Sequence, residues 1–323
     1  MKQEECRLHI VDMHCDTISE LILETTGKYD ENLRKNSKHV DLLRMKEAGY
    51  LLQNFALYVN KEKYPNVKSR VLELLDYYCA EIEKNSDLIA PVTCMADIEK
   101  NRVLGKMSSM LTIEEGAALE GSIHTLKDFF DKGVRMITLT WNYPNELGFP
   151  HGYNERTDGR YGLTSIGKEM VETMENMGII VDVSHLSDEG FYDVLKCTRK
   201  PFAASHSNAR EVCCVSRNLS DDMIRCIGER GGVIGLNFYP IFLGNNGTIE
   251  SVISHAKHII NVGGVDVLGL GSDFDGIEGQ KELLGVQTMP DLIDALQRAG
   301  FVGAVVEKIL GGNVLRVYKD VIG

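Results

Sequence analysis

His185 and His206 are the residues of this chain that most directly suggest chemistry. Each follows a serine at the end of a short apolar run, residues 179–183 and 202–204, and a helix-like stretch separates the two runs. Such runs are typical of buried parallel strands, whose carboxyl ends meet at one edge of a sheet. Two imidazoles at that edge suggest a metal site, although two hydrogen-bonded polar residues at strand ends would give the same pattern.

A second pair of candidate ligands lies near the amino terminus. His14 and Asp16 follow the apolar run 8–11, and their spacing of two places both side chains on one face of a strand. A histidine and a carboxylate that project together from a strand end can bind a divalent metal. The alternative is an ordinary polar strand end.

Carboxylates follow two further apolar runs. Glu114 and Glu115 follow residues 108–113, and Asp273 follows residues 267–271. If all these strands belong to one sheet, the acids lie at the same edge as the histidines. The alternative for the glutamates is a solvated loop.

The rest of the chain supplies the framework for these residues. Strand-like runs alternate with amphipathic helical stretches, and we predict eight strands, at 8–11, 51–59, 108–113, 134–140, 179–183, 202–204, 232–238 and 267–271. Helices are predicted at 41–48, 66–85, 122–132, 164–177, 253–262, 290–299 and 302–310, and Ser187 and Ser220 are predicted to cap two more. This order predicts an α/β fold, a closed (β/α)8 TIM-type barrel forming one catalytic domain over residues 1–323, with an open doubly wound sheet as the alternative.

Composition limits the possible partners. The chain has 323 residues and a net charge of −12, which argues against nucleic acid or an anionic membrane as a partner. Its eight cysteines form no C-x-x-C pair, and its first residues resemble no export signal. We therefore expect free thiols and a cytoplasmic protein.

Together the candidates predict a binuclear metal centre on the carboxyl-terminal rim of the barrel. Imidazoles with carboxylates suit zinc, with manganese, iron and cobalt as alternatives. One carboxylate among four other ligands could bridge two ions, which would hold a hydroxide nucleophile between them. Asp273 is placed to move a proton.

The sequence resembles the membrane (renal) dipeptidase family, peptidase family M19, of the amidohydrolase superfamily. The similarity is carried by D-M-H-C-D-T (12–17), I-E-E-G (113–116), V-R-M-I-T-L-T (134–140), I-V-D-V-S-H-L-S (180–187), A-S-H-S-N-A-R (204–210), R-N-L-S-D-D-M-I (217–224), G-V-I-G-L-N-F-Y (232–239) and G-S-D-F-D-G (271–276). It implies a zinc-dependent dipeptidase with two ions per chain that accepts L,L and L,D dipeptides, and a homodimer.

The resemblance also implies a role for each candidate ligand. His14 and Asp16 would bind one zinc ion, His185 and His206 would bind the other, and Glu114 would bridge them. Glu114 is preferred to Glu115 because it keeps the family's spacing to residues 133–135.

Substrate contacts are implied in the same way. Asp273 matches the family's acid/base carboxylate, and Arg217 matches the arginine that holds the free carboxylate of the dipeptide. The animal enzymes have a substrate-contacting histidine where this chain has Trp141, so Trp141 or His151 is expected to take that role within a pocket-forming loop, residues 141–162. Two other readings stay open, another binuclear amidohydrolase acting on a small carboxylate-bearing amide or lactone, and a non-catalytic metal-binding scaffold.

Overall fold

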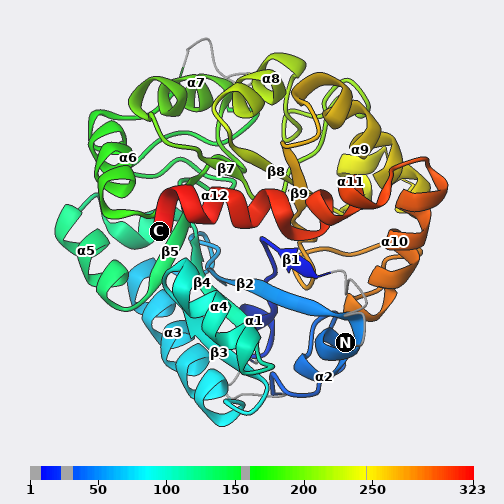
Figure 1. Ribbon diagram of the computed structural model, residues 1–323. Coiled ribbons are helices and arrows are strands. Elements are labelled where there is room, and N and C mark those ends of the chain that lie inside the picture. Colours follow the sequence, from blue (N-terminus) through cyan, green and yellow to red (C-terminus); the bar gives the residue numbers. More distant parts are fainter. Residues whose placement is uncertain (1–8, 23–31, 154–160, 245) are drawn as a thin grey trace.

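Eight parallel strands close into a barrel in the computed structural model (Figure 1), which describes residues 9–22, 32–153, 161–244 and 246–323. The barrel strands are β1 (Ile10–Asp12), β2 (Tyr50–Tyr58), β4 (Met107–Glu114), β5 (Val134–Thr138), β6 (Ile180–Asp182), β7 (Ala203–Ala204), β8 (Val233–Leu236) and β9 (Leu268–Leu270). β2 pairs with both β1 and β4, and this closes the sheet. The predicted (β/α)8 barrel is confirmed, and all eight predicted strands are present with boundaries shifted by a few residues.

A ninth strand was not predicted. β3 (Ile89–Val92) pairs with Met107–Met110 of β4, while β5 pairs with the later residues of the same strand. β3 therefore lies outside the closed barrel. Its four residues include Pro91, and a proline in so short a run argues against a central strand, which is why sequence patterning overlooked it.

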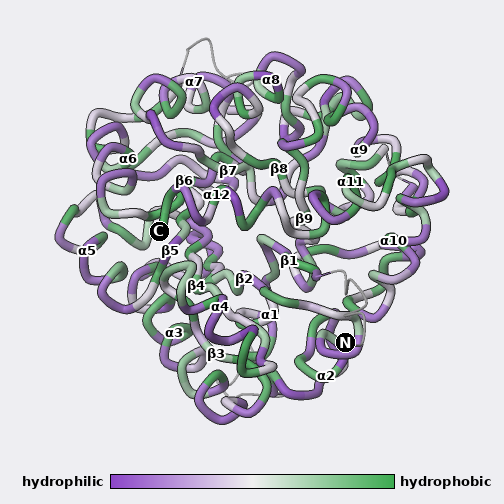
Figure 2. Tube along the Cα trace, in the orientation of Figure 1, coloured by the Kyte–Doolittle hydropathy of each residue, from purple (hydrophilic) through white to green (hydrophobic). Residues whose placement is uncertain are grey.

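Helices connect the strands and cover the barrel. They are α1 (Thr17–Glu20), α2 (Leu42–Ala48), α3 (Val67–Lys84), α4 (Met95–Val103), α5 (Ile123–Asp131), α6 (Ser165–Met177), α7 (Asp188–Cys197), α8 (Asp221–Glu229), α9 (Ile249–Gly263) and α10 (Met289–Arg298). The two predicted caps are confirmed, since the hydroxyls of Ser187 and Ser220 accept hydrogen bonds from the amides of Gly190 and Met223. Hydrophobic and hydrophilic residues alternate along these helices (Figure 2), as expected of helices that pack one face on a barrel.

The predicted structure of the last residues of the chain was wrong. The helix expected at 302–310, followed by a short tail, is instead α11 (Gly303–Glu307), a π-helical turn at Lys308–Gly312, and a full helix, α12 (Asn313–Ile322). α12 crosses the barrel end (Figure 1) and packs with Ile180, Ala203 and Val233, the first residues of β6, β7 and β8. It therefore covers the amino end of the barrel, opposite the rim that was predicted to hold the site.

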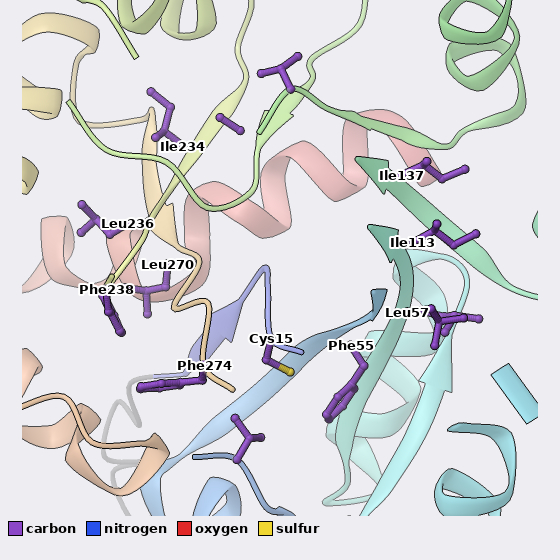
Figure 3. Packing of buried hydrophobic residues seen from close by; sticks show 14 of the residues in the cluster. Cys15, Phe55, Leu57, Ile113, Ile137, Ile234, Leu236, Phe238, Leu270 and Phe274 are labelled. Carbon is purple, nitrogen blue, oxygen red and sulfur yellow. The ribbon is translucent and has the colours of Figure 1, made fainter. Parts of the chain in front are cut away.

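Successive side chains along each barrel strand point alternately outward, into the apolar core, and inward, toward the site. The larger apolar cluster joins outward strand residues such as Leu57, Ile113 and Ile137 to the surrounding helices (Figure 3), and it includes Phe238 and Phe274 near the rim. The residue after Ile113 is Glu114, whose side chain therefore points into the barrel.

The seven cysteines that the structure describes are free thiols, as predicted; Cys6 lies outside these residues. Among the described residues no helix is both long and apolar enough to span a membrane.

Candidate metal centre and active site

Glu114 lies at the centre of the predicted ligand cluster. Its Oε1 is 3.1 Å from Nε2 of His185 and 3.4 Å from Nε2 of His206, and its Oε2 is 3.3 Å from Nε2 of His14. These residues stand at the carboxyl ends of β4, β6, β7 and β1, so the barrel brings four distant segments to one point. Glu115 does not take part, because its Oε1 accepts hydrogen bonds from Asn145 and from the amide of Ala117.

Two acids complete the cluster on the side of β1 and β9. Oδ1 of Asp16 and Oδ1 of Asp273 each lie 3.8 Å from Nε2 of His14. Among the described residues, two groups of three side chains have ligand atoms close enough to share an ion. The first group is His14, Glu114 and His206, and the second is His14, Asp16 and Asp273. The barrel thus brings together all five predicted ligands and Asp273.

The hydrogen-bonding of this cluster fits a bound cation. Both ring nitrogens of His14 and Oδ1 of Asp16 are buried and have no hydrogen-bond partner among the described residues. Nε2 of His185 lies 3.0 Å from Nε2 of His206. Buried polar atoms without partners are costly, and so many lone pairs facing one another need protons or a cation between them. Imidazole nitrogens and carboxylate oxygens are the donor set that Zn²⁺ and similar divalent ions prefer.

Burial and charge favour the metal-binding forms of three of these side chains. Burial, assisted by Arg217, lowers the pKa of His185 to about 3. Burial and the charge of His14 hold the pKa of His206 well below its usual value. Burial raises the pKa of Glu114, but His14 outweighs it and holds that pKa well below its usual value. Neutral imidazoles and an ionised carboxylate are the states that bind a metal.

The pKa values of His14 and Asp16 are shifted in the opposite direction. Burial lowers the pKa of His14, but Glu114 and Asp16 outweigh it and raise that pKa well above its usual value. Burial and the negative charge of Glu114 raise the pKa of Asp16. The negative charge gathered around His14 contributes to both shifts, and a bound cation would compensate the same charge.

A buried hydrogen-bond relay orients His206. The hydroxyl of Ser205 donates to Oδ2 of Asp182 at 2.5 Å, which leaves its oxygen to accept from Nδ1 of His206 at 2.7 Å. Oδ1 of Asp182 also accepts from the amides of Ser184 and Ser205. The proton is thereby fixed on Nδ1, and Nε2 of His206 is free to bind a metal. Sequence reasoning missed this relay, although an acid within the apolar run 179–183 was a visible signal.

The loop after β5 folds over His185. The backbone amide of His151 donates to the carbonyl of His185 at 2.7 Å. In the His151 ring, Nδ1 lies 3.1 Å from Oγ of Ser216, and Nε2 lies 3.2 Å from Oδ1 of Asn142. The ring centres of Trp141 and His185 lie 6.2 Å apart, and the Trp141 ring packs edge-on against the ring of Tyr58. The described part of the predicted loop 141–162 therefore reaches the site, and residues 154–160 lie outside the described residues.

Asp273 and Arg217 flank the ligands. Oδ2 of Asp273 accepts a hydrogen bond from Asn237 at 2.8 Å, and burial raises the pKa of Asp273 to about 6. The Arg217 guanidinium is buried, and it donates to Oγ of Ser207 at 2.8 Å and to the carbonyl of His206 at 2.9 Å. Its Nε has no partner among the described residues.

Several rim residues have strained backbones. φ is +67° at His185, +63° at Asp273, +70° at Asp275 and +107° at Glu115. Non-glycine residues adopt positive φ at a cost of order 1–3 kcal/mol, and such strain gathers at functional sites. Two of these four residues, His185 and Asp273, direct their side chains into the cluster.

A pocket of about 350 Å³ opens onto this cluster. Its walls include Asp16, Glu114, His185 and Asp273, together with Tyr58, Trp141, Asn142, Tyr239 and Phe242. A larger hollow of about 720 Å³ between α9 and α10 contains none of the predicted ligands. The smaller pocket is therefore the candidate active site.

Comparison with known proteins agrees with this geometry. The family model for membrane dipeptidases, peptidase family M19, matches residues 4–322. An uncharacterised dipeptidase of Schizosaccharomyces pombe is 34% identical over 88% of this chain and 72% of its own length. Dipeptidase aclJ of Aspergillus oryzae is 32% identical over 87% of this chain and 70% of its own.

Solved structures give the same result. The crystal structure of dipeptidase AC, a metallopeptidase of family M19, superposes with a TM-score of 0.87 at 26% identity, covering 98% of this chain and 99% of that one. A metallopeptidase of Rhodobacter sphaeroides liganded with a phosphinate mimic of L-Ala-D-Ala shares the fold at 24% identity, with a TM-score of 0.86 and coverage of 98% and 99%. By sequence and by fold, this chain is a metal-dependent hydrolase that belongs to the membrane dipeptidase family, peptidase family M19.

Proposed function

We propose that the protein hydrolyses the peptide bond of L,L and L,D dipeptides with two zinc ions per chain. The observation that carries this proposal is the position of Glu114, whose two oxygens lie within 3.4 Å of three imidazoles at the floor of the pocket. One carboxylate that reaches ligands on two sides is the arrangement that a pair of metal ions requires. The R. sphaeroides relative, liganded with a dipeptide mimic, adds support for the L,D substrates.

The roles proposed for the ligands follow from their positions. His14 and Asp16 would hold one ion, His185 and His206 the other, and Glu114 both. When bound, two zinc ions supply a hydroxide nucleophile at neutral pH and polarise the scissile carbonyl. Burial favours the neutral forms of His185 and His206. The Asp182–Ser205 relay orients His206, and Asn142 orients His185.

Asp273 is proposed to move the proton. Its Oδ2 is held by Asn237, while its Oδ1 points toward His14 and the predicted ions. A carboxylate in this position can accept a proton from the nucleophile and deliver it to the departing amine. A pKa near neutrality suits both steps, and burial raises that of Asp273 to about 6.

Arg217 is proposed to hold the free carboxylate of the dipeptide. Its guanidinium is fixed by Ser207 and His206, and the Phe242 ring at the pocket wall lies 5.5 Å from it. Burial lowers the pKa of Arg217 to about 10, so the side chain keeps its charge at neutral pH. A planar guanidinium can pair with a carboxylate through two hydrogen bonds.

The second candidate is another binuclear amidohydrolase that acts on a small carboxylate-bearing amide or lactone. Arg217 favours this candidate as much as it favours dipeptides, because it would recognise the carboxylate and not the peptide bond. A cytoplasmic homodimer also belongs to the proposal, and the free thiols support the cellular location.

The deciding experiment is release of amino acids from matched L,L and L,D dipeptides by the purified protein, before and after chelation and after zinc is restored. We expect hydrolysis of both series, loss on chelation and recovery with zinc. Zinc-dependent hydrolysis of N-acyl amino acids or lactones with no dipeptide turnover would favour the second candidate. No turnover in any series by zinc-loaded protein would contradict both.

A further inference from the structure

The amide of Asn142 lies between two imidazoles at the rim of the barrel. Its Oδ1 is 3.0 Å from Nδ1 of His185 and 3.2 Å from Nε2 of His151. Asn142 also forms part of the pocket wall beside Glu114 and Asp273. One face of this side chain therefore meets a predicted metal ligand, and the residue as a whole borders the space for substrate.

The protons around Asn142 can be assigned from the neighbouring groups. Nε2 of His185 faces Glu114 and His206, so it carries a lone pair when it binds metal, and Nδ1 then carries the proton. That proton is donated to the amide oxygen of Asn142. The amide oxygen of Asn142 can only accept, so Nε2 of His151 also donates to it, and Nδ1 of His151 faces the hydroxyl of Ser216.

This assignment uses the oxygen of Asn142 fully and leaves its nitrogen without a role. An amide oxygen has two lone pairs, and the two imidazoles occupy both. Nδ2 carries two protons, and no acceptor for them is found among the residues that the structure describes. An amide donor without an acceptor on a pocket wall is available to a ligand.

The pocket has few other donors for a substrate oxygen. Its acidic wall residues accept hydrogen bonds when ionised and cannot donate; they are Asp16, Glu20, Glu114, Asp273, Asp275 and Glu278. Apart from His185, whose Nδ1 proton is donated to Asn142, the neutral side-chain donors in the wall are Tyr58, Trp141, Asn142 and Tyr239. Among these four, Asn142 is the one whose side chain is hydrogen-bonded to a predicted metal ligand, His185. The position of the Asn142 side chain is therefore coupled directly to that of the predicted metal centre.

We propose that Asn142 has two functions: its oxygen fixes the tautomer of His185, and its nitrogen donates a hydrogen bond to an oxygen of the substrate. This inference rests on the proposed function, because a dipeptide supplies such an oxygen in its scissile carbonyl and in its terminal carboxylate. Asn142 is accordingly a substrate-binding residue as well as a positioning residue for the metal ligand.

Two substitutions separate the functions. Asn142→Asp keeps oxygen acceptors for His185 and His151 but removes the donor. Asn142→Ala removes both and adds no charge. Zinc affinity is measured by competition with a chromophoric chelator, and binding of a phosphinate dipeptide analogue is measured by calorimetry at saturating zinc.

We expect the two measurements to diverge. Asn142→Ala should weaken zinc binding by roughly 10- to 100-fold, while Asn142→Asp should bind zinc at least as tightly as the unaltered protein. Both variants should bind the analogue roughly 10- to 100-fold more weakly once zinc is saturating. Equal losses in kcat/KM for a dipeptide and its C-terminal amide would place the donor on the scissile carbonyl, and a loss confined to the free acid would place it on the carboxylate.

Two outcomes would overturn the inference. If Asn142→Asp binds the analogue and turns over dipeptides as the unaltered protein does, the nitrogen has no contact with substrate. If Asn142→Asp loses zinc as Asn142→Ala does, the oxygen does not orient His185. Failure of the proposed function is a different result, in which the unaltered zinc-loaded protein neither binds the analogue nor hydrolyses any dipeptide.

Discussion

His185 and His206 direct their Nε2 atoms at each other across 3.0 Å, from the ends of two neighbouring strands. Both side chains are buried, and burial lowers the pKa of each, so a shared proton does not explain the contact easily. Oε1 of Glu114 lies within 3.4 Å of both nitrogens. Three lone-pair atoms therefore converge on one point, and a cation there would resolve the conflict.

The first prediction concerns metal content. Purified protein should contain about two divalent ions per chain by elemental analysis. Glu114→Ala should reduce occupancy at both positions because Glu114 reaches the ligands on both sides. Glu115→Ala is the matched control, since the neighbouring side chain binds Asn145 instead. If Glu115→Ala loses metal and Glu114→Ala does not, the bridging role has been given to the wrong residue.

The second prediction concerns proton transfer. Asp273→Asn keeps the shape of the side chain and its contact with Asn237 but removes the base. Turnover should fall by roughly 10²-fold or more, since general acid–base catalysis contributes about that much. Metal content and thermal stability, measured on the same samples, should change little. A variant that keeps near-normal turnover would show that another group carries the proton.

The third prediction concerns carboxylate recognition. Arg217→Lys keeps the charge but loses the planar fork, so kcat/KM for a dipeptide should fall by roughly 10- to 100-fold. The matching dipeptide amide, which lacks the carboxylate, should be affected much less. Arg210→Lys is the control, because Arg210 pairs with Asp188. Equal losses on acid and amide would assign Arg217 a structural role.

The fourth prediction concerns the relay behind His206. Ser205→Ala removes the acceptor for Nδ1 of His206, and zinc affinity should fall by roughly 10- to 100-fold. Thr138→Val is the matched control, since the Thr138 hydroxyl donates to the same oxygen of Asp182 but does not touch His206. It should reduce stability and leave zinc affinity unchanged. The same loss of zinc in both variants would mean that the relay only stabilises the barrel.

The fifth prediction concerns acid stability. His255 is buried, its Nδ1 accepts a hydrogen bond from the amide of Ala209, and burial lowers its pKa to about 4. The unfolded chain therefore binds more protons than the folded one between the ordinary histidine pKa, about 6.5, and about 4. The stability that neutral His255 contributes is complete above pH 6.5 and is lost as the pH falls toward 4.

Urea unfolding of metal-free protein checks this sign. The free energy of unfolding of the unaltered protein relative to His255→Gln should decrease by about 2–3 kcal/mol between pH 7 and pH 4. A difference between the two proteins that does not change with pH would contradict the prediction.

The sequence alone was sufficient to predict the barrel, and it also predicted which polar residues meet at its carboxyl-terminal rim. Alternation of apolar runs with amphipathic stretches is a local property, set by periods of two and 3.6 residues, and it predicted all eight barrel strands. Polar residues that follow those runs have to meet at the carboxyl-terminal rim once the barrel closes. His14, Asp16, His185 and His206 could therefore be placed at one rim from their positions alone, whereas the choice of Glu114 over Glu115 depended on the resemblance to the family.

The tertiary structure decided how those side chains are held. Asn142 and His185 are 43 positions apart, and Ser205 meets Asp182 across 23, so no local period relates them. β3 was missed because it forms a strand only in contact with β4. α12 is different, since the spacing of Val314, Val317 and Val321 is a clear helical pattern that the prediction of a short tail overlooked. Residue types and spacing determine which groups reach the rim, whereas ring orientation, tautomer and available donors depend on partners that only the closed barrel brings within hydrogen-bond distance.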